Sequence, residues 1–100
     1  MLLEYQGVKP TSCMITTAHN PVPLRFVLHH IQPKEAGGPT TDANLANVCD
    51  SCHYSTHRVM YALAKGQPVP KTHRNIIKLA RRGYDACVAA GTVDKIPNEG

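Results

Sequence analysis

The feature that most restricts the fold of this chain is a central run of metal-binding residues, Cys49-x-x-Cys52-His53-x-x-x-His57. The chain has 100 residues, one Phe and no Trp, so it can bury only a modest apolar core, and domains of this size often add a bound metal or disulfides. His53 and His57 are spaced i, i+4, so a helix places both imidazoles on one face, where they can bind one metal. Because this spacing is also common in ordinary helices, the pair alone leaves a metal site and a structural pair open.

The four cysteines indicate metal binding rather than disulfide bonds. The first six residues lack the basic and long apolar segments of a secretory signal, and no apolar run is long enough to span a membrane. We therefore expect a cytoplasmic protein that has reduced thiols and no membrane partner. Cys87 stands alone in the sequence, and we interpret it as a small buried hydrophobic residue.

The charge of the chain permits a polyanionic partner. Eleven Lys and Arg against seven Asp and Glu give a formal net charge of +4 and a sequence pI of about 9.0. Many basic proteins bind no nucleic acid, so this excess is compatible with DNA binding without establishing it.

The order of elements predicts an α+β domain. Residues 24–31 are apolar and rich in β-formers, which predicts a strand that Pro33 ends. A polar loop over 33–43 and a second extended segment over 44–49 follow. A helix should begin near Asp50 or Ser51, either of which can cap it, and end at Gly66.

A second, amphipathic helix is predicted over 73–90, capped by Thr72 and ended by Gly91. Its apolar residues recur at helical spacing and should form a buried stripe: Ile76, Ile77, Ala80, Tyr84, Cys87 and Val88. The opposite side has four basic residues, Arg74, Lys78, Arg81 and Arg82. Such a face is usually solvated, and contact with a DNA backbone is the alternative. We expect residues 1–12 to form an irregular arm and 92–100 a frayed tail.

Three further pieces precede the central run, in the order His29-His30-Ile31-x-Pro33, the Gly37-Gly38 loop and Asn44-Leu45. Together with Cys49-x-x-Cys52-His53, this ordered set resembles the HNH endonucleases, also called ββα-metal or His-metal-finger nucleases. The resemblance covers about residues 13–64 and implies a small ββα-metal core, with the second helix as an addition, in one nuclease domain over 1–100.

The resemblance also implies a role for each matching residue. His30 takes the place of the general base that activates water, and Asn44 that of the residue that orients it through the loop. His29, His53 and His57 take the places of the ligands of one divalent metal, although the commoner family pattern has Asp at the position of His29. A neutral His with a pKa near 6.5 can accept a proton at cellular pH.

The implied activity is hydrolysis of DNA phosphodiester bonds with little sequence preference, leaving 5′-phosphate and 3′-hydroxyl ends. The catalytic cation would be Mg, Mn, Ni or Zn, and imidazole ligands favour the last three over magnesium. Stand-alone HNH proteins of this length resemble those of bacteriophages, which often act beside the packaging terminase in the infected host cell. Single-strand nicking and double-strand cutting remain open, as does the oligomeric state.

Many HNH proteins also have a structural, treble-clef-like zinc site at the start of the helix. We expect one formed by Cys13, His19, Cys49 and Cys52, with Cys87 as another possible fourth ligand. Zinc would stabilise so small a core because its binding free energy adds to the free energy of folding.

Three alternatives remain for the same residues. The first is a zinc-stabilised DNA-binding module without cleavage, which leaves His29, His30 and His57 unexplained. The second is a structural protein that keeps a relic HNH fold, against which the intact His30, Asn44 and His53 argue. The third is c-type haem attachment at Cys49-x-x-Cys52-His53, which normally requires export.

Overall fold

A two-stranded antiparallel sheet and two helices make up the computed structural model, which describes residues 13–16 and 25–97. β1 (Phe26–His30) pairs with β2 (Leu45–Cys49) in a register that sets His29 opposite Ala46 and His30 opposite Leu45. α1 (Asp50–Lys65) begins at the residue after β2, and α2 (Arg74–Ala90) follows a short connector. This order confirms the predicted α+β fold with a ββα core and an added helix.

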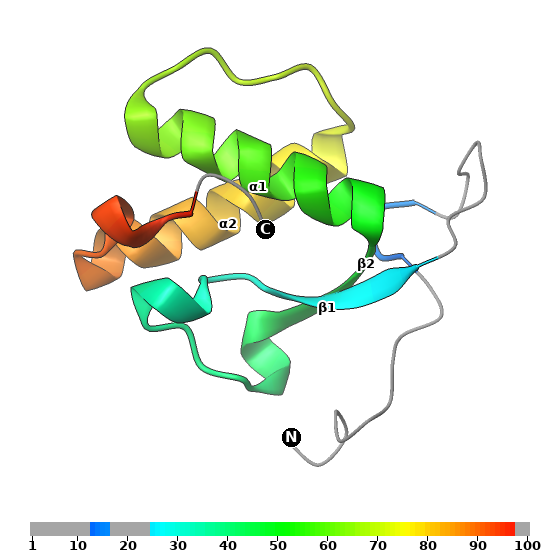
Figure 1. Ribbon diagram of the computed structural model, residues 1–100, viewed down its shortest axis with the longest axis horizontal. Helices are drawn as coiled ribbons and strands as arrows, with labels where there is room; N and C mark the ends of the chain where they lie inside the picture. The colour runs from blue at the N-terminus through cyan, green and yellow to red at the C-terminus, as the bar shows by residue number, and fades with distance from the viewer. Residues whose placement is uncertain (1–12, 17–24, 98–100) are drawn as a thin grey trace.

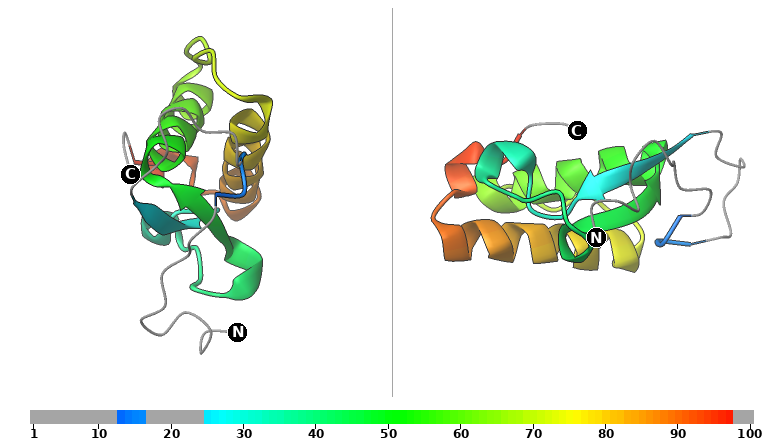
Figure 2. Two further views of the ribbon diagram at one scale, coloured as in Figure 1. Left: turned by 90° about the vertical axis from the view of Figure 1, so that its right-hand side faces the viewer. Right: turned by 90° about the horizontal axis from the view of Figure 1, so that it is seen from below.

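The elements form layers around a small core. α1 lies over the sheet, and α2 packs against α1 on the side away from the viewer of Figure 1, as the side view in Figure 2 shows. The largest fully buried side chains come from β1, β2, α1 and α2: Met60, His29, Val48, Val59, Thr56, Cys49 and Cys87. Because two of these are a histidine and a threonine, the core is not purely apolar at the sheet–α1 interface.

The caps of both helices differ from the prediction by one residue. Asp50 is already helical, and Cys49, which has extended backbone angles, caps α1 by accepting a hydrogen bond from the Cys52 amide at 3.4 Å. His73 caps α2 in place of Thr72, because its Nδ1 accepts from the Asn75 amide at 3.1 Å. At the other ends, Gly66 and Gly91 have left-handed angles and terminate the helices as predicted.

The buried stripe of α2 is rotated relative to the prediction. Ile76, Ala80 and Cys87 are buried as expected, but Leu79 and Gly83 replace Ile77 and Tyr84, which are only partly buried. Val88 is 51% exposed, so its place in the stripe was predicted wrongly. Gly83 explains the rotation, since its missing side chain lets the helix backbone approach the Ile31 carbonyl.

The segment after α2 is more ordered than the predicted frayed tail. Residues Val93–Lys95 form a 3-10 turn, η4, and Ile96 beside it is 6% exposed within the core cluster. Two further 3-10 turns, η2 (Lys34–Ala36) and η3 (Asp42–Asn44), lie in the predicted polar loop. The expected arm over 1–12 lies outside the described residues, as does Leu24 of the predicted first strand.

Candidate metal centre

Three histidines from two elements converge at the interface between the sheet and α1. His29 lies on β1 and is fully buried, and its ring contacts the rings of His53 and His57 on α1 edge to face. The Nε2 atoms of His53 and His57 are 3.1 Å apart. One ring nitrogen of each residue lies within 4.8 Å of the other two, so the three could hold one metal ion.

The hydrogen bonding of this cluster fits a metal. Both ring nitrogens of His29 and Nδ1 of His57 are buried and have no hydrogen-bond partner among the described residues. Burying a polar atom without a partner costs free energy, and such atoms are rare in folded proteins. A cation bound to one lone pair of each imidazole would remove part of this cost, so the cluster has the donor chemistry that a divalent metal needs.

Burial keeps these histidines neutral. It lowers the pKa of His29 from 6.5 to about 3, with further lowering by His57, His53 and His30. Burial, together with His53, lowers the pKa of His57 to about 4, against a small opposing effect of Glu35. The pKa of His53 is lowered by burial as well. At neutral pH all three rings therefore offer lone pairs instead of positive charges.

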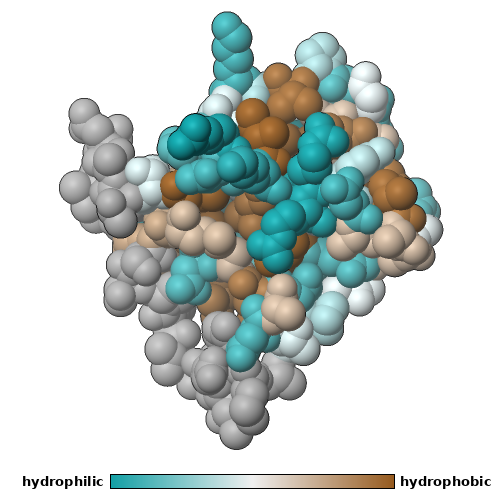
Figure 3. Space-filling view, turned by 180° about the vertical axis from the view of Figure 1, so that it is seen from behind, coloured by the Kyte–Doolittle hydropathy of each residue, from teal (hydrophilic) through white to brown (hydrophobic). Residues whose placement is uncertain are grey.

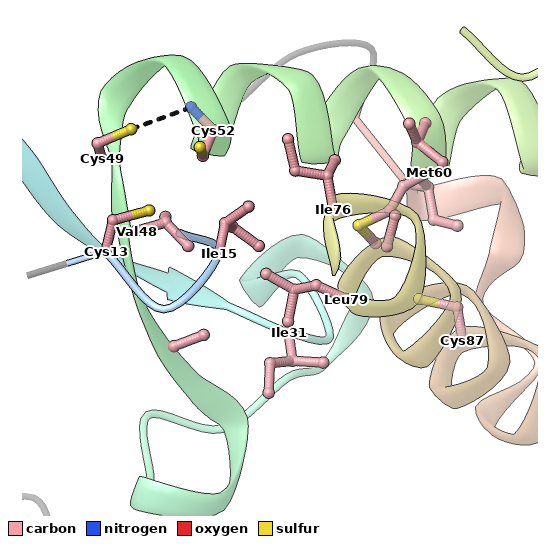
Figure 4. Packing of buried hydrophobic residues seen from close by; sticks show 14 of the residues in the cluster. Cys13, Ile15, Ile31, Val48, Cys49, Cys52, Met60, Ile76, Leu79 and Cys87 are labelled. Carbon is pink, nitrogen blue, oxygen red and sulfur yellow. Dashed lines mark hydrogen bonds between the residues drawn. The ribbon is translucent and has the colours of Figure 1, made fainter. Parts of the chain in front are cut away.

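A second cluster consists of three cysteines. Cys13 comes from the N-terminal segment, Cys49 from the end of β2 and Cys52 from the first turn of α1, and their sulfurs lie within 4.8 Å of one another. Figure 4 shows the three sulfurs at one end of the core and Cys87 at the other. All four cysteines are free and buried. Cys87 is thus separate from the cluster. His19, the other residue predicted as a fourth ligand of the cluster, lies outside the described residues.

The surroundings of the cysteines favour one thiolate. Burial acts to raise the pKa of Cys49, but hydrogen bonds from the Ser51 hydroxyl and the Cys52 amide outweigh it, and the pKa is lowered. The pKa of Cys52 is raised by burial and by its two cysteine neighbours. The Met14 amide donates to the Asn47 carbonyl at 2.7 Å, which fixes the Cys13 segment against β2. Three sulfurs held in this way could bind zinc.

His30 lies next to the three-histidine cluster without belonging to it. It lines an open hollow of about 240 Å³ together with Leu28, Pro33, Lys34, Glu35, His53, His57 and Pro97. Its Nε2 is 2.9 Å from the Thr40 hydroxyl. Burial and the nearby Lys34 lower its pKa, while Glu35 acts in the opposite direction. The structure thus separates the adjacent histidines, with His29 in the cluster and His30 on the accessible wall beside it.

Asn44 closes the loop between the strands. Its Oδ1 accepts from the Gln32 amide at 2.9 Å, and its Nδ2 donates to the carbonyls of Gln32 and Pro39 at 3.0 and 2.8 Å. Its own carbonyl accepts from the Ile31 amide. These bonds fix both arms of the loop, and the loop positions Thr40 against His30. No sequence pattern marks Thr40, because a hydroxyl in a Gly- and Pro-containing loop has no spacing signal.

The four basic residues of α2 lie away from this centre. Arg74, Lys78, Arg81 and Arg82 are all exposed, and they project from the face of α2 opposite its buried stripe. In the view from behind, hydrophilic side chains cover much of the surface (Figure 3). The hollow with His30 is lined by residues of β1, the loop after it, α1 and the C-terminal segment, and none of its lining residues comes from α2. The structure therefore does not bring the basic face and the histidine centre together.

No helix within residues 13–16 and 25–97 is long and apolar enough to cross a membrane.

A family model described as HNH endonuclease matches residues 11–58. No curated protein and no solved structure matches the chain. The matched residues include both candidate metal clusters, His30 and Asn44, and they end before α2. In this chain α2 extends the matched region by a second helix. Residues 11–58 therefore form a domain of the HNH family, whose members are nucleases that use divalent metals.

Proposed function

We propose that this protein is a metal-dependent DNA endonuclease that hydrolyses phosphodiester bonds with little sequence preference, by nicking or double-strand cutting. The observation that best supports it is the pairing of three neutral imidazoles, two buried and one half-buried, with His30, which lines the hollow beside them. A zinc-binding module without activity requires neither feature. We treat residues 1–100 as one nuclease domain, because α2 packs directly on α1.

In this proposal His30 is the general base. In the tautomer that this proposal requires, Nε2 has the proton and donates it to the Thr40 hydroxyl, so that the Nδ1 lone pair takes the proton of the attacking water. The lowered pKa of His30 keeps the ring neutral at cellular pH, which a base requires. Asn44 is a positioning residue, since it clamps the loop that carries Thr40.

His29, His53 and His57 would hold the divalent cation. That ion would neutralise charge on the scissile phosphate and stabilise the departing 3′ oxygen. Because all three side chains are nitrogen ligands, zinc, nickel or manganese should suit the site better than magnesium. A full set of imidazoles in place of an acidic ligand leaves the ligand set itself without negative charge, and Glu35 is the one carboxylate that lines the adjoining hollow.

A separate structural zinc site is proposed at Cys13, Cys49 and Cys52, with His19 as the fourth ligand. It would tie the N-terminal segment to the junction of β2 and α1, directly beside the helix that holds His53 and His57. The zinc would thereby stabilise the domain without taking part in the reaction.

The basic face of α2 is proposed to contact the backbone of a DNA segment other than the one being cut, because it points away from the hollow with His30. A place beside a phage terminase in DNA packaging is a further hypothesis, which comes only from the resemblance to short phage proteins. Copurification of the chain with a terminase subunit would test it.

Plasmid cleavage tests the main proposal. Supercoiled DNA is incubated with the protein and Mg, Mn, Ni or Zn, and the ends are analysed for 5′-phosphate. We expect His30→Ala to lose at least a hundred-fold in rate, in line with the usual contribution of a general base, about 10²–10⁴-fold. The matched control is His73→Asn, which replaces a histidine outside both clusters by another good helix cap.

Two results would overturn the proposal. If His30→Ala cuts as fast as the parent, His30 is not the base. If the parent binds DNA but never cuts with any of the four metals, the protein is a zinc-stabilised DNA-binding module, the alternative that the cysteine cluster favours.

A further inference from the structure

The outward face of α1 has an unusual alternation of aromatic and basic side chains. Tyr54, Arg58, Tyr61 and Lys65 follow one another at spacings of four, three and four residues. At about 100° per residue they fall within about 60° of one another on the helix surface. We call these four residues the α1 ridge. Arg58 and Lys65 are exposed, Tyr54 is 49% exposed and Tyr61 is partly buried, so the ridge faces solvent along most of the helix.

Each tyrosine of the ridge is paired with a cation. The Arg58 guanidinium carbon lies 5.8 Å from the centre of the Tyr54 ring, and the Lys65 ammonium nitrogen lies 5.5 Å from that of Tyr61. Exposed cation–π pairs are weak, so a ligand with both an aromatic ring and a negative charge can compete for them. A nucleotide has both, with the base for the ring and the phosphate for the cation.

The ridge adjoins the histidine centre and a hollow. Tyr54 lies three residues before His57 and Tyr61 four residues after it, so both neighbour His57 on the surface of α1. Arg58 and Tyr61 also line a hollow of about 210 Å³ with Ala62, Gln67, Pro68 and Pro70 of the connector. The sole carboxylate of the helix, Asp50, lies at its start, and the hollow itself has no acidic lining residue. A strand leaving the catalytic hollow would therefore meet aromatic rings and positive charge.

Stacking on tyrosine requires an unpaired base. In a duplex the faces of the bases are covered by their neighbours, whereas in a single strand each base can offer its face to an aromatic side chain. We propose that the α1 ridge binds a single-stranded segment of the DNA substrate, so that the enzyme prefers DNA with an unpaired strand next to the scissile phosphate. This inference rests on the proposed nuclease function, but the binding of DNA to the α1 ridge can be measured without cleavage.

The test compares the affinity for a labelled 15-nucleotide oligo-dT with that for a hairpin duplex, by fluorescence anisotropy in the His30→Ala background. The double variant Tyr54→Leu, Tyr61→Leu should bind the single strand about ten-fold or more weakly, since stacking supplies about 1–3 kcal/mol per base. Its affinity for the duplex should change less than about two-fold. The double variant Tyr54→Phe, Tyr61→Phe keeps the rings and should bind the single strand like the parent.

The matched charge control compares two pairs of cations. Arg58→Gln, Lys65→Gln and Arg81→Gln, Arg82→Gln each remove two positive charges, the first from the ridge and the second from α2. The α2 pair should weaken binding of both DNAs without lowering the preference for the single strand, because backbone contacts depend on phosphate charge, which is denser in the duplex. The ridge pair should lower the preference for the single strand.

Tyrosine fluorescence provides a measurement that needs no leucine variant. The chain has four Tyr and no Trp, so stacking of a base on the ridge should quench the tyrosine emission of the parent, and the Phe variant should show less quenching. The inference is overturned if the leucine and Phe variants bind the single strand with equal affinity, or if the leucine variant loses affinity for the single strand and the duplex by the same factor. It is also overturned if the single strand leaves the tyrosine emission of the parent unchanged. None of these results bears on whether His30 catalyses cleavage, which the plasmid assay decides.

Discussion

His29 and His30 are neighbours in the sequence and differ in almost every physical respect. His29 is fully buried with two unpartnered nitrogens, whereas His30 is partly exposed and bonded to Thr40. A strand alternates its side chains between two faces, so adjacent residues meet different surroundings. The proposed division between ligand and base follows from this alternation.

The pH dependence of folding should reveal the buried histidine. A His whose pKa is about 6.5 unfolded and about 3 folded binds a proton more readily in the unfolded state. Its stabilising contribution is therefore present above pH 6.5 and is lost as the pH falls towards 3. For the metal-free protein we expect the free energy of unfolding to drop by about 2 kcal/mol between pH 6.5 and 5 through His29 alone.

Urea unfolding in the presence of a chelator measures this drop. The variant His29→Gln removes the titrating group and should show a shallower pH dependence, whereas His73→Asn should keep the parent's slope. An unchanged slope in His29→Gln would assign the pH dependence to other groups.

Asn44 gives a second prediction at the level of a single residue. Asn44→Ala removes three side-chain hydrogen bonds and leaves the Gln32 amide and two carbonyls without this partner. We expect a loss of about 1–3 kcal/mol in the free energy of unfolding, the cost of unpaired polar groups. Asn47→Ala, at an exposed position of β2, should change stability by less than about 0.5 kcal/mol. Equal effects of the two variants in urea unfolding would show that the clamp contributes little.

Among the elements, the packing of α2 depends on one glycine, Gly83. A Cβ added at Gly83 would lie 2.2 Å from the Ile31 carbonyl oxygen and 2.7 Å from the Met60 Cε. The methionine end can move, but the backbone carbonyl cannot without disturbing the end of β1. The contact among α1, α2 and β1 thus depends on a position without a side chain.

Gly83→Ala should therefore destabilise the protein, although alanine is the better helix former by about 1 kcal/mol. Overpacking costs about 1–3 kcal/mol and more against backbone, so we expect a net loss of about 2 kcal/mol in thermal or urea unfolding. Asp85→Ala, at an exposed position of the same helix, reports helix propensity alone and should be neutral or slightly stabilising. A stabilised Gly83→Ala would contradict the close approach of the helix to Ile31.

For the whole molecule, the proposed roles divide the two clusters between stability and chemistry. The cysteines join the N-terminal segment, β2 and α1, whereas the histidines join β1 to α1. Both clusters use α1, so loss of the structural zinc should also disturb the position of His53. In a core this small, each cluster replaces apolar contacts that a larger domain would have.

Zinc content and thermal unfolding separate the clusters. Cys49→Ser should lose one equivalent of zinc and several degrees or more of Tm, since the binding free energy of a structural zinc stabilises the fold. Cys87→Ala removes a buried thiol outside the cluster and should keep that zinc, and His53→Ala should keep it while losing cleavage. If Cys87→Ala loses zinc and Cys49→Ser does not, the assignment of the structural site fails.

The sequence determined by itself the order of strands and helices, the helix ends at Gly66 and Gly91, and the shared helix face of His53 and His57. Local chemistry is sufficient for these, because left-handed glycines end helices and an i, i+4 pair shares one helix face in any fold. The two N-caps could not be predicted from the sequence, because Cys49 and His73 are unusual capping residues. Their side chains reach the first turn of each helix because of the path of the preceding chain.

Tertiary structure decided the rest. That Cys13 joins Cys49 and Cys52 while Cys87 does not depends on how the N-terminal segment lies along β2. The rotation of α2, which buries Leu79 and Gly83 and exposes Val88, depends on one close approach between elements far apart in the sequence. The contact of Thr40 with His30 depends on the closure of a loop. Each of these depends on a long-range contact. Periodicity along a chain predicts which residues share a face of a helix or strand, but it does not predict what that face packs against.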